Sequence, residues 1–215
     1  MPSLVNELVA EGVQAILTSG FPAVAACKGA PVPAIASGAG DLVALGLVES
    51  FRHPGGNITG ISDLTGELAP KRLSLLKEMS PSIHKVAMLW NGADAAMGQR
   101  YQLSAASASS LDLRVQPLSV REPHDFDAAF AKMERDPPDA GFMVVDGLTG
   151  SNRKRVIQFA AAHRIPFMYE GDFIVREGGL LSYRRQNISR DQKPDWELAS
   201  PKCLVLPVAS GSPPG

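Results

Sequence analysis

Residues 85–118 have the sequence KVAMLWNGADAAMGQRYQLSAASASSLDLRVQPL, which contains a complete strand–helix–strand pattern. The apolar run at residues 85–90 predicts a buried strand, and the Ala-rich stretch at residues 95–110 predicts a long helix. Residues 113–118 predict a second strand. A strand followed by a helix and another strand forms a parallel unit whose helix crosses over the sheet. This stretch therefore indicates an α/β fold.

The same alternation extends in both directions along the chain. Further strands are predicted at residues 15–17, 32–36, 57–61, 140–145, 166–169 and 179–183. Further helices are predicted at residues 4–11, 22–28, about 41–50, 68–79, 123–133 and 152–163. The pattern predicts two Rossmann-like lobes, each a parallel sheet flanked by helices.

The alternation also predicts where the lobes divide. It is interrupted near residues 63–69, which gives an N-terminal α/β lobe at 1–65 and a C-terminal α/β lobe at 66–187. The first lobe opens with a helix instead of a strand, so its sheet is expected to be incomplete. Residues 188–215 are rich in Pro and Ser, and we expect a poorly ordered tail with at most one short strand at 203–206.

Composition excludes several classes of partner. Of the 215 residues, 45% are hydrophobic and 20% are charged, as in ordinary globular proteins. The formal net charge of -1 gives no basic excess, so nucleic acid is not an expected partner. No apolar run approaches the roughly 20 residues that span a bilayer. The first residues lack a basic start and an apolar stretch, so no export signal is expected in the chain as written.

The signals for enzyme chemistry are weak. Gly38 and Gly40 lie between a predicted strand and a predicted helix, as in a dinucleotide fingerprint. Asp63 follows them at the sequence separation expected for an acid that binds a ribose. The third glycine of that fingerprint is replaced by Val43. His84, His124 and His163 show no metal-ligand spacing, and no nucleophile elbow is present. We expect no cofactor, metal or catalytic residue, and a nucleotide-using enzyme on a Rossmann-like fold stays an alternative.

Polar residues collect where the predicted strands end. In open parallel sheets, ligands bind beyond the carboxyl ends of the strands. The polar residues at these ends are Thr18, Ser19, Ser37, Asp41, Ser62, Asp63, Asn91, Asp146, Tyr169 and Glu170. Any single Asp or Asn among them can equally be a helix cap. As a set, they predict a polar cleft between the two lobes.

Several segments resemble one family of proteins. The matching segments are residues 17–23, 40–41, 46–48, 52–60, 71–78 with Pro81, 86–91 and 178–183. Together they resemble a group of substrate-binding proteins of bacterial ABC importers with the type I periplasmic-binding fold. The resemblance covers roughly residues 4–187, and residues 54–60 are its most specific part.

The resemblance implies two lobes joined by crossover strands, with a small solute caught between them by hinge closure. It implies that Ser19 and neighbouring N–H groups hold a ligand carboxylate, and that Asp41 and Asp146 hold a ligand ammonium. Asn91 would donate and accept hydrogen bonds, and Tyr183 would supply apolar contact and a hydroxyl.

The resemblance further implies an ABC permease of the inner membrane as partner and a periplasmic location. Some members resemble binders of aromatic amino acids. Members usually carry Asp-Pro where this chain has Asp41-Leu42. The opening strand–helix–strand and the helix after Tyr183 are not found, so we expect a truncated copy whose ability to function stays open. A small-molecule sensor on the same fold stays a second alternative.

Overall fold

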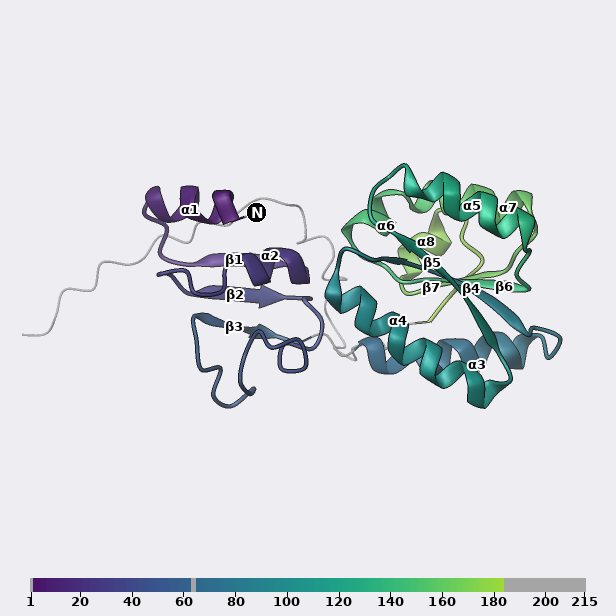
Figure 1. The fold of residues 1–215 in the computed structure, drawn as a ribbon, viewed down its shortest axis with the longest axis horizontal. Helices are drawn as coiled ribbons and strands as arrows, with labels where there is room; N and C mark the ends of the chain where they lie inside the picture. The colour runs from purple at the N-terminus through teal and green to yellow at the C-terminus, as the bar shows by residue number, and fades with distance from the viewer. Residues whose placement is uncertain (1, 63–64, 184–215) are drawn as a thin grey trace, which may run out of the picture.

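Two parallel sheets form the framework of the computed structural model, which describes residues 2–62 and 65–183 (Figure 1). The first sheet has the order β1-β2-β3, with β1 at Ile16–Ser19, β2 at Ala34–Ser37 and β3 at Ile58–Ile61. The second has the order β5-β4-β6-β7-β8. Its strands are β4 (Lys85–Asn91), β5 (Arg114–Val120), β6 (Ala140–Met143), β7 (Phe167–Tyr169) and β8 (Leu181–Ser182). The predicted α/β class with parallel sheets is confirmed.

Helices connect the strands in the order expected for crossover units, except between β2 and β3, where the chain forms a single turn. In the first lobe, taken here as α1 to β3, the helices are α1 (Pro2–Ala10) and α2 (Phe21–Ala26). The second lobe, taken as α3 to β8, contains α3 (Ala69–Met79), α4 (Ala95–Ala108), α5 (Asp125–Arg135), α6 (Gly147–Ser151), α7 (Arg153–Ala162) and α8 (Asp172–Arg176). Single 3-10 turns lie at η1 (Thr65–Leu68) and η2 (Ser109–Leu111).

The second sheet is buried on both faces. Val86 and Met88 of β4 pack with residues of α3 and α4, whereas Ala87 and Leu89 pack with residues of α5, α7 and α8. Figure 1 shows α3 and α4 on one side of this sheet and α5 and α7 on the other. Because both faces of β4 are covered, its sequence is a continuous apolar run.

The first sheet is covered on one face. Ile16, Ala34 and Ile58 are buried with Val5 of α1 and Val24 of α2 in a single core cluster. Alternate residues of a strand point to opposite faces, so the side chains between these positions lie on the other face. Leu17 and Ile35 on that second face are exposed.

The predicted helix at about 41–50 is wrong, because the chain there makes one turn and stops. Gly46 has φ of +68°, a left-handed conformation that ends a helix. The N–H of Leu47 donates to the carbonyl of Leu42 over 2.9 Å, and that of Gly46 donates to Val43 over 2.9 Å. These two bonds form a Schellman motif, which turns Leu47 and Val48 into the core.

Three other comparisons with the sequence predictions concern two short helices, the division into lobes, and the residues outside the described ranges. The short helices α6 and α8 are additional to the predicted elements. The division into lobes at 1–65 and 66–187 stays a prediction. Asp63, the tail at 188–215 and the strand at 203–206 lie outside the described residues.

Candidate functional site

The carboxyl ends of the two sheets face each other across the contact between the lobes. Figure 1 shows the arrowheads of β2 and β3 directed toward the second lobe, with the amino end of α4 nearest to the first. A Cβ added to Gly40, in the loop after β2, would lie 2.8 Å from the Cβ of Ala96 in α4. Phe21 and Leu45 of the first lobe pack against the second-lobe cluster that contains Ala96. The lobes therefore meet at the strand ends where the sequence predicts a ligand.

Asn91 and Asp146 lie together in the second lobe. Asn91 ends β4 and Asp146 follows the neighbouring strand β6, and Asn91 Nδ2 donates to Asp146 Oδ2 over 2.6 Å. Asn91 Oδ1 accepts from the N–H of Ala93 over 2.9 Å. Asp146 Oδ1 accepts from the N–H of Thr149 over 2.9 Å, in a capping box that begins α6. The structure thus gives both residues internal partners, and Asp146 is a helix cap as well as a strand-end acid.

Asp41 and Ser19 lie at the end of the first sheet. Asp41 Oδ1 accepts from the N–H groups of Val43 and Ala44 over 3.0 and 3.1 Å, so this carboxylate caps the single turn after β2. Ser19 is exposed and is paired in register with Ser37. Within residues 2–62 and 65–183, no hydrogen bond links Ser19 or Asp41 to the second-lobe residues of the predicted site.

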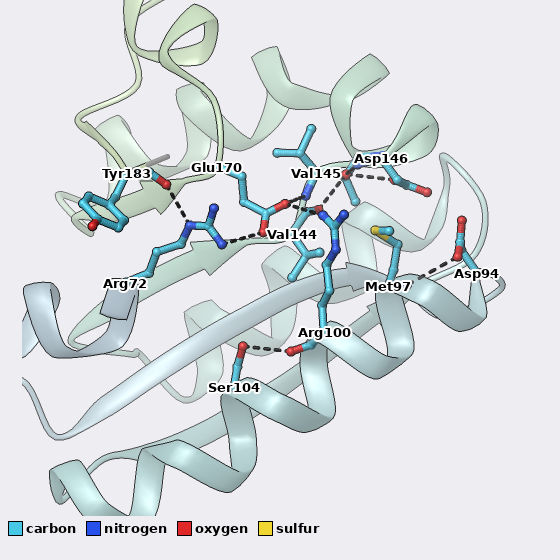
Figure 2. Close-up of polar contacts among 11 residues, drawn as sticks. Arg72, Asp94, Met97, Arg100, Ser104, Val144, Val145, Asp146, Glu170 and Tyr183 are labelled. Carbon is cyan, nitrogen blue, oxygen red and sulfur yellow. Dashed lines mark hydrogen bonds and ion pairs between the residues drawn. The ribbon is translucent and has the colours of Figure 1, made fainter. Parts of the chain in front are cut away.

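Tyr183 lies on the α3 and α4 side of the second sheet, where its partly buried side chain packs against the core. Its carbonyl oxygen accepts from Nε of Arg72 over 2.9 Å, as Figure 2 shows. Its N–H donates to the carbonyl of Tyr169 over 3.2 Å. Tyr169 itself is 1% exposed and belongs to the core, so its position at a strand end does not make it a cleft residue.

Glu170, which directly follows β7, is the centre of a buried ionic cluster in the second lobe (Figure 2). Glu170 Oε1 lies 2.9 Å from Nη1 of Arg72, and Glu170 Oε2 lies 3.0 Å from Nη1 of Arg100. The N–H of Val145 also donates to Oε2 over 2.9 Å. The side chains of Arg72, Arg100 and Glu170 are 0%, 9% and 8% exposed, so the cluster is almost removed from water.

Sequence reasoning identified only part of this cluster. The sequence places Glu170 at a predicted strand end and gives it no role in the site. Arg72 and Arg100 lie in helices, and a helical arginine is usually solvated. Their burial depends on a partner 98 and 70 residues away in the chain, which no local pattern reveals.

Asp94 is the N-cap residue of α4, the helix that also contains Arg100 of this cluster. Its carboxylate accepts from the N–H groups of Ala96 and Met97 over 2.8 and 3.3 Å. Burial raises the pKa of Asp94, and the nearby Asp146 carboxylate raises it further, against the lowering effect of the two N–H groups and Arg100. The N–H groups of Ala96 and Met97 therefore already donate hydrogen bonds within the protein.

Three surface hollows of 420, 390 and 490 Å³ lie elsewhere. The first lies beside α7 and β7, the second beside Arg114, and the third beside Pro54. None of them is lined by Ser19, Asp41, Asn91, Asp146 or Tyr183. The candidate site is defined by the facing strand ends and not by these hollows.

Other kinds of site receive little support from the described residues. Among them, no group of three or more His, Cys, Asp or Glu side chains is arranged to hold a metal ion. Gly38 and Gly40 precede a single turn, so the helix that would receive a pyrophosphate after a dinucleotide fingerprint is not formed there. Among residues 2–62 and 65–183, no helix is both long and apolar enough to cross a membrane.

Two of the solved structures that resemble this chain illustrate its fold. A Streptococcus pneumoniae protein in complex with L-Trp has a TM-score of 0.77 and 23% identity, and the match covers 86% of this chain and 62% of that one. A conserved domain protein of Vibrio cholerae has a TM-score of 0.77, 20% identity and the same coverage. At these identities the likeness concerns the fold alone.

Sequence comparisons identify the family. A tyrosine-binding protein of Clostridioides difficile is 23% identical over 180 residues, which are 83% of this chain and 51% of that protein. The chain thus spans about half the length of this curated relative. The family model of ABC transporter substrate binding proteins matches residues 3–189, which is most of the chain. In agreement with the resemblance seen in its sequence, the chain belongs to the ABC transporter substrate-binding protein family.

Proposed function

We propose that this chain binds a small solute, of the amino-acid class, between its two lobes as the substrate-binding component of an ABC importer. Membership of a family of binding proteins, which are not enzymes, supports this role. The observation that carries the proposal is the meeting of two sheets at their carboxyl ends, with Gly40 of one lobe against Ala96 of the other. In open α/β sheets, this end is where ligands bind.

The proposed roles follow the chemistry of an amino acid. Ser19 and nearby N–H groups would hold the carboxylate, and Asp41 and Asp146 would face the ammonium. The bond from Asn91 holds the Asp146 carboxylate in one orientation, which supports its use as a fixed acceptor. Tyr183 would contact the ligand side chain. Asp41 and Asp146 each retain lone pairs beyond their capping bonds, because a carboxylate accepts about four hydrogen bonds.

Aromatic amino acids are the first ligands to test. The Clostridioides difficile relative is a tyrosine-binding protein, and the Streptococcus pneumoniae structure contains L-Trp. Phe21 follows Ser19 by two residues and is partly buried at the contact between the lobes. Aromatic surface therefore adjoins the residue proposed to hold the carboxylate, which supports a ligand with an aromatic side chain.

Membership of the family supports a proposal for the partner and the location. We propose that the chain delivers its solute to an ABC permease of the inner membrane from the periplasmic side. A protein with this role would bind its ligand reversibly and without chemical change.

The direct test is ligand-dependent unfolding of the full chain with L-Trp, L-Tyr, L-Phe and L-Leu. A ligand at about 100 times its dissociation constant should add roughly 2.7 kcal/mol of stability. 3-Phenylpropanoate, which is L-Phe without its ammonium group, is the matched control and should stabilise the chain less. If neither the amino acids nor the carboxylate raises the unfolding temperature, the proposal is wrong.

A variant tests whether Asp146 faces the ammonium. Asp146→Asn should weaken binding of the stabilising amino acid about tenfold, or ~1.4 kcal/mol. Binding of 3-phenylpropanoate should be unaffected. Asp127→Asn, which changes an exposed carboxylate on α5, is the matched control and should leave both ligands unaffected. Equal losses for both ligands in Asp146→Asn would remove this residue from the ammonium site.

A further inference from the structure

Two residues of the proposed ligand site follow the strands that lie on either side of β7. The second sheet ends in the order β6-β7-β8, with Asp146 as the third residue after β6 and Tyr183 directly after β8. Glu170 directly follows β7, so it lies between these two strand ends at the carboxyl edge of the sheet. A side chain in this position is able to hold both neighbouring strand ends.

One oxygen of Glu170 holds the backbone that carries Asp146. The regular pairing of β6 with β4 and β7 ends at Met143. Two residues further on, the N–H of Val145 donates to Glu170 Oε2 over 2.9 Å, as Figure 2 shows. The bond therefore fixes the chain at the residue directly before Asp146, where the strand pairing no longer does so.

The other oxygen of Glu170 acts on Tyr183 through Arg72. Glu170 Oε1 lies 2.9 Å from Nη1 of Arg72, and Nε of the same guanidinium donates to the carbonyl of Tyr183 over 2.9 Å. A guanidinium is planar and rigid, so the contact with Glu170 also fixes the nitrogen that holds Tyr183. Cζ of Arg72 lies 5.7 Å from the centroid of the Phe142 ring in β6, which adds a cation–π contact.

Burial makes both links rigid. The side chains of Arg72 and Glu170 are 0% and 8% exposed, so little water competes for their hydrogen bonds. A binding site gains affinity when its groups are held in the bound geometry before the ligand arrives. We propose that Glu170 is a positioning residue of the ligand site, which sets affinity by holding Asp146 and the backbone at Tyr183. This inference rests on the proposed function, because it requires Asp146 and Tyr183 to contact the solute.

Replacing Glu170 by glutamine tests the proposal, because both carboxylate oxygens act as acceptors. A glutamine side chain has one acceptor oxygen, so Glu170→Gln must lose either the bond from Val145 or the bond from Arg72. Calorimetric titrations of the full chain with L-Trp, L-Tyr, L-Phe and L-Leu first identify the amino acid that the wild type binds most tightly. That amino acid should bind Glu170→Gln about tenfold more weakly.

The two ways of failing are distinguishable. If Glu170→Gln binds the amino acid as tightly as the wild type does, the positioning role is wrong and the proposed function stands. If the wild type binds none of the four amino acids, the proposed function is wrong and the positioning role is wrong with it.

A double-mutant cycle with Asp146→Asn separates positioning from a general loss of rigidity. If Glu170 acts through Asp146, its effect should shrink once residue 146 no longer carries the charge that faces the ammonium. In the Asp146→Asn background, Glu170→Gln should therefore weaken binding less than about threefold, and this remainder is the part that acts through Tyr183. The full tenfold loss in that background would mean independent effects and would contradict the proposal.

Met133→Ala in α5 is the control for stability. It truncates a side chain that is 1% exposed and that packs on the face of the sheet opposite to α3 and α4. This variant should unfold at a lower temperature than the wild type and bind the amino acid with unchanged affinity. A tenfold loss of affinity in Met133→Ala would mean that destabilisation alone explains the effect of Glu170→Gln.

Arg72→Lys replaces Glu170→Gln if the latter does not fold. A lysine keeps the positive charge but lacks the rigid fork that holds Glu170 and Tyr183 together. Arg72→Lys should weaken binding of the amino acid at least about threefold. Lys71→Arg, at the neighbouring exposed position of α3, is its matched control and should bind as the wild type does. Equal affinities in Arg72→Lys and Lys71→Arg would contradict the proposal.

Discussion

The side-chain amide of Asn91 donates to a carboxylate oxygen of Asp146 over 2.6 Å, and this bond joins the ends of two neighbouring strands. The same Asp146 begins α6 through its capping box with Thr149. Two residues predicted to bind ligand therefore also stabilise the local fold. Effects on stability and on ligand binding have to be separated when either residue is changed.

The bond between Asn91 and Asp146 should contribute measurably to stability. Asn91→Ala leaves a partly buried carboxylate with one donor fewer, and we expect a loss of about 1–2 kcal/mol in the free energy of unfolding. Urea unfolding followed by circular dichroism measures it. Gln102→Ala on the exposed side of α4 is the control and should lie within about 0.5 kcal/mol of the wild type. A loss for Asn91→Ala no larger than that of the control would show that the bond contributes nothing in solution.

The buried carboxylate of Glu170 should contribute more than an exposed one. Glu170→Gln removes the negative charge that faces the guanidinium groups of Arg72 and Arg100, and breaking a buried pair costs about 3–5 kcal/mol. Glu177→Gln removes the negative charge that faces Arg153 and one of the two acceptor oxygens. Because the side chains of Arg153 and Glu177 are 29% and 31% exposed, this change should cost less than about 1 kcal/mol. Urea unfolding of both variants gives the comparison. Similar losses in the two variants would mean that the Glu170 cluster is well solvated.

The carboxyl of Asp94 should make the protein less stable as pH rises. Its pKa is raised by burial, so between the ordinary value of about 3.9 and the higher folded value the folded state binds more protons than the unfolded state. Stability from this group is therefore present at low pH and is lost as pH rises through that interval.

Two substitutions separate the charge of Asp94 from its cap. Asp94→Asn keeps an acceptor for the N–H groups of Ala96 and Met97 and removes the buried charge, so stability should fall less between acidic and neutral pH than in the wild type. Asp94→Ala also removes the charge but loses the cap, and should be less stable than Asp94→Asn by about 1 kcal/mol at every pH. Unfolding measured across this pH range checks both. An unchanged pH profile in Asp94→Asn would contradict the raised pKa.

The sequence predicts those parts of the fold that depend on local patterns. The run at residues 85–90 predicts β4 because a strand buried on both faces must be apolar throughout. The sequence after Asp41 favours a longer helix, because Ala44 and Leu45 suit a helix, whereas the structure ends the turn at the left-handed Gly46. Local patterns do not reveal the conformation that a glycine adopts.

Local patterns likewise predict only part of the candidate site. Asn91 and Asp146 could be predicted as neighbours, since the ends of adjacent parallel strands meet at one sheet edge. The burial of Arg72 and Arg100 could not, because it follows from the tertiary contact of two helices with Glu170. That each predicted acid caps its own chain segment also depends on backbone geometry, which composition and spacing leave open.

The contact between Gly40 and Ala96 should control the spacing of the lobes. A Cβ at position 40 would lie 2.8 Å from the Cβ of Ala96, closer than two carbon atoms can pack, and Gly40 has φ of +84°. Gly40→Ala should therefore separate the lobes and enlarge the radius of gyration in small-angle X-ray scattering. Gly40→Ala should also lower the free energy of unfolding by about 1–2 kcal/mol, because the left-handed conformation disfavours a side chain.

Adding Ala96→Gly removes one partner of the clash and should restore the radius of gyration, while the backbone cost of position 40 persists. Gly56→Ala is the matched control, since no atom lies within 4 Å of the added Cβ and its φ is not left-handed. If Ala96→Gly leaves the Gly40→Ala chain expanded, the expansion comes from backbone strain in the first lobe and the contact with α4 does not set the spacing.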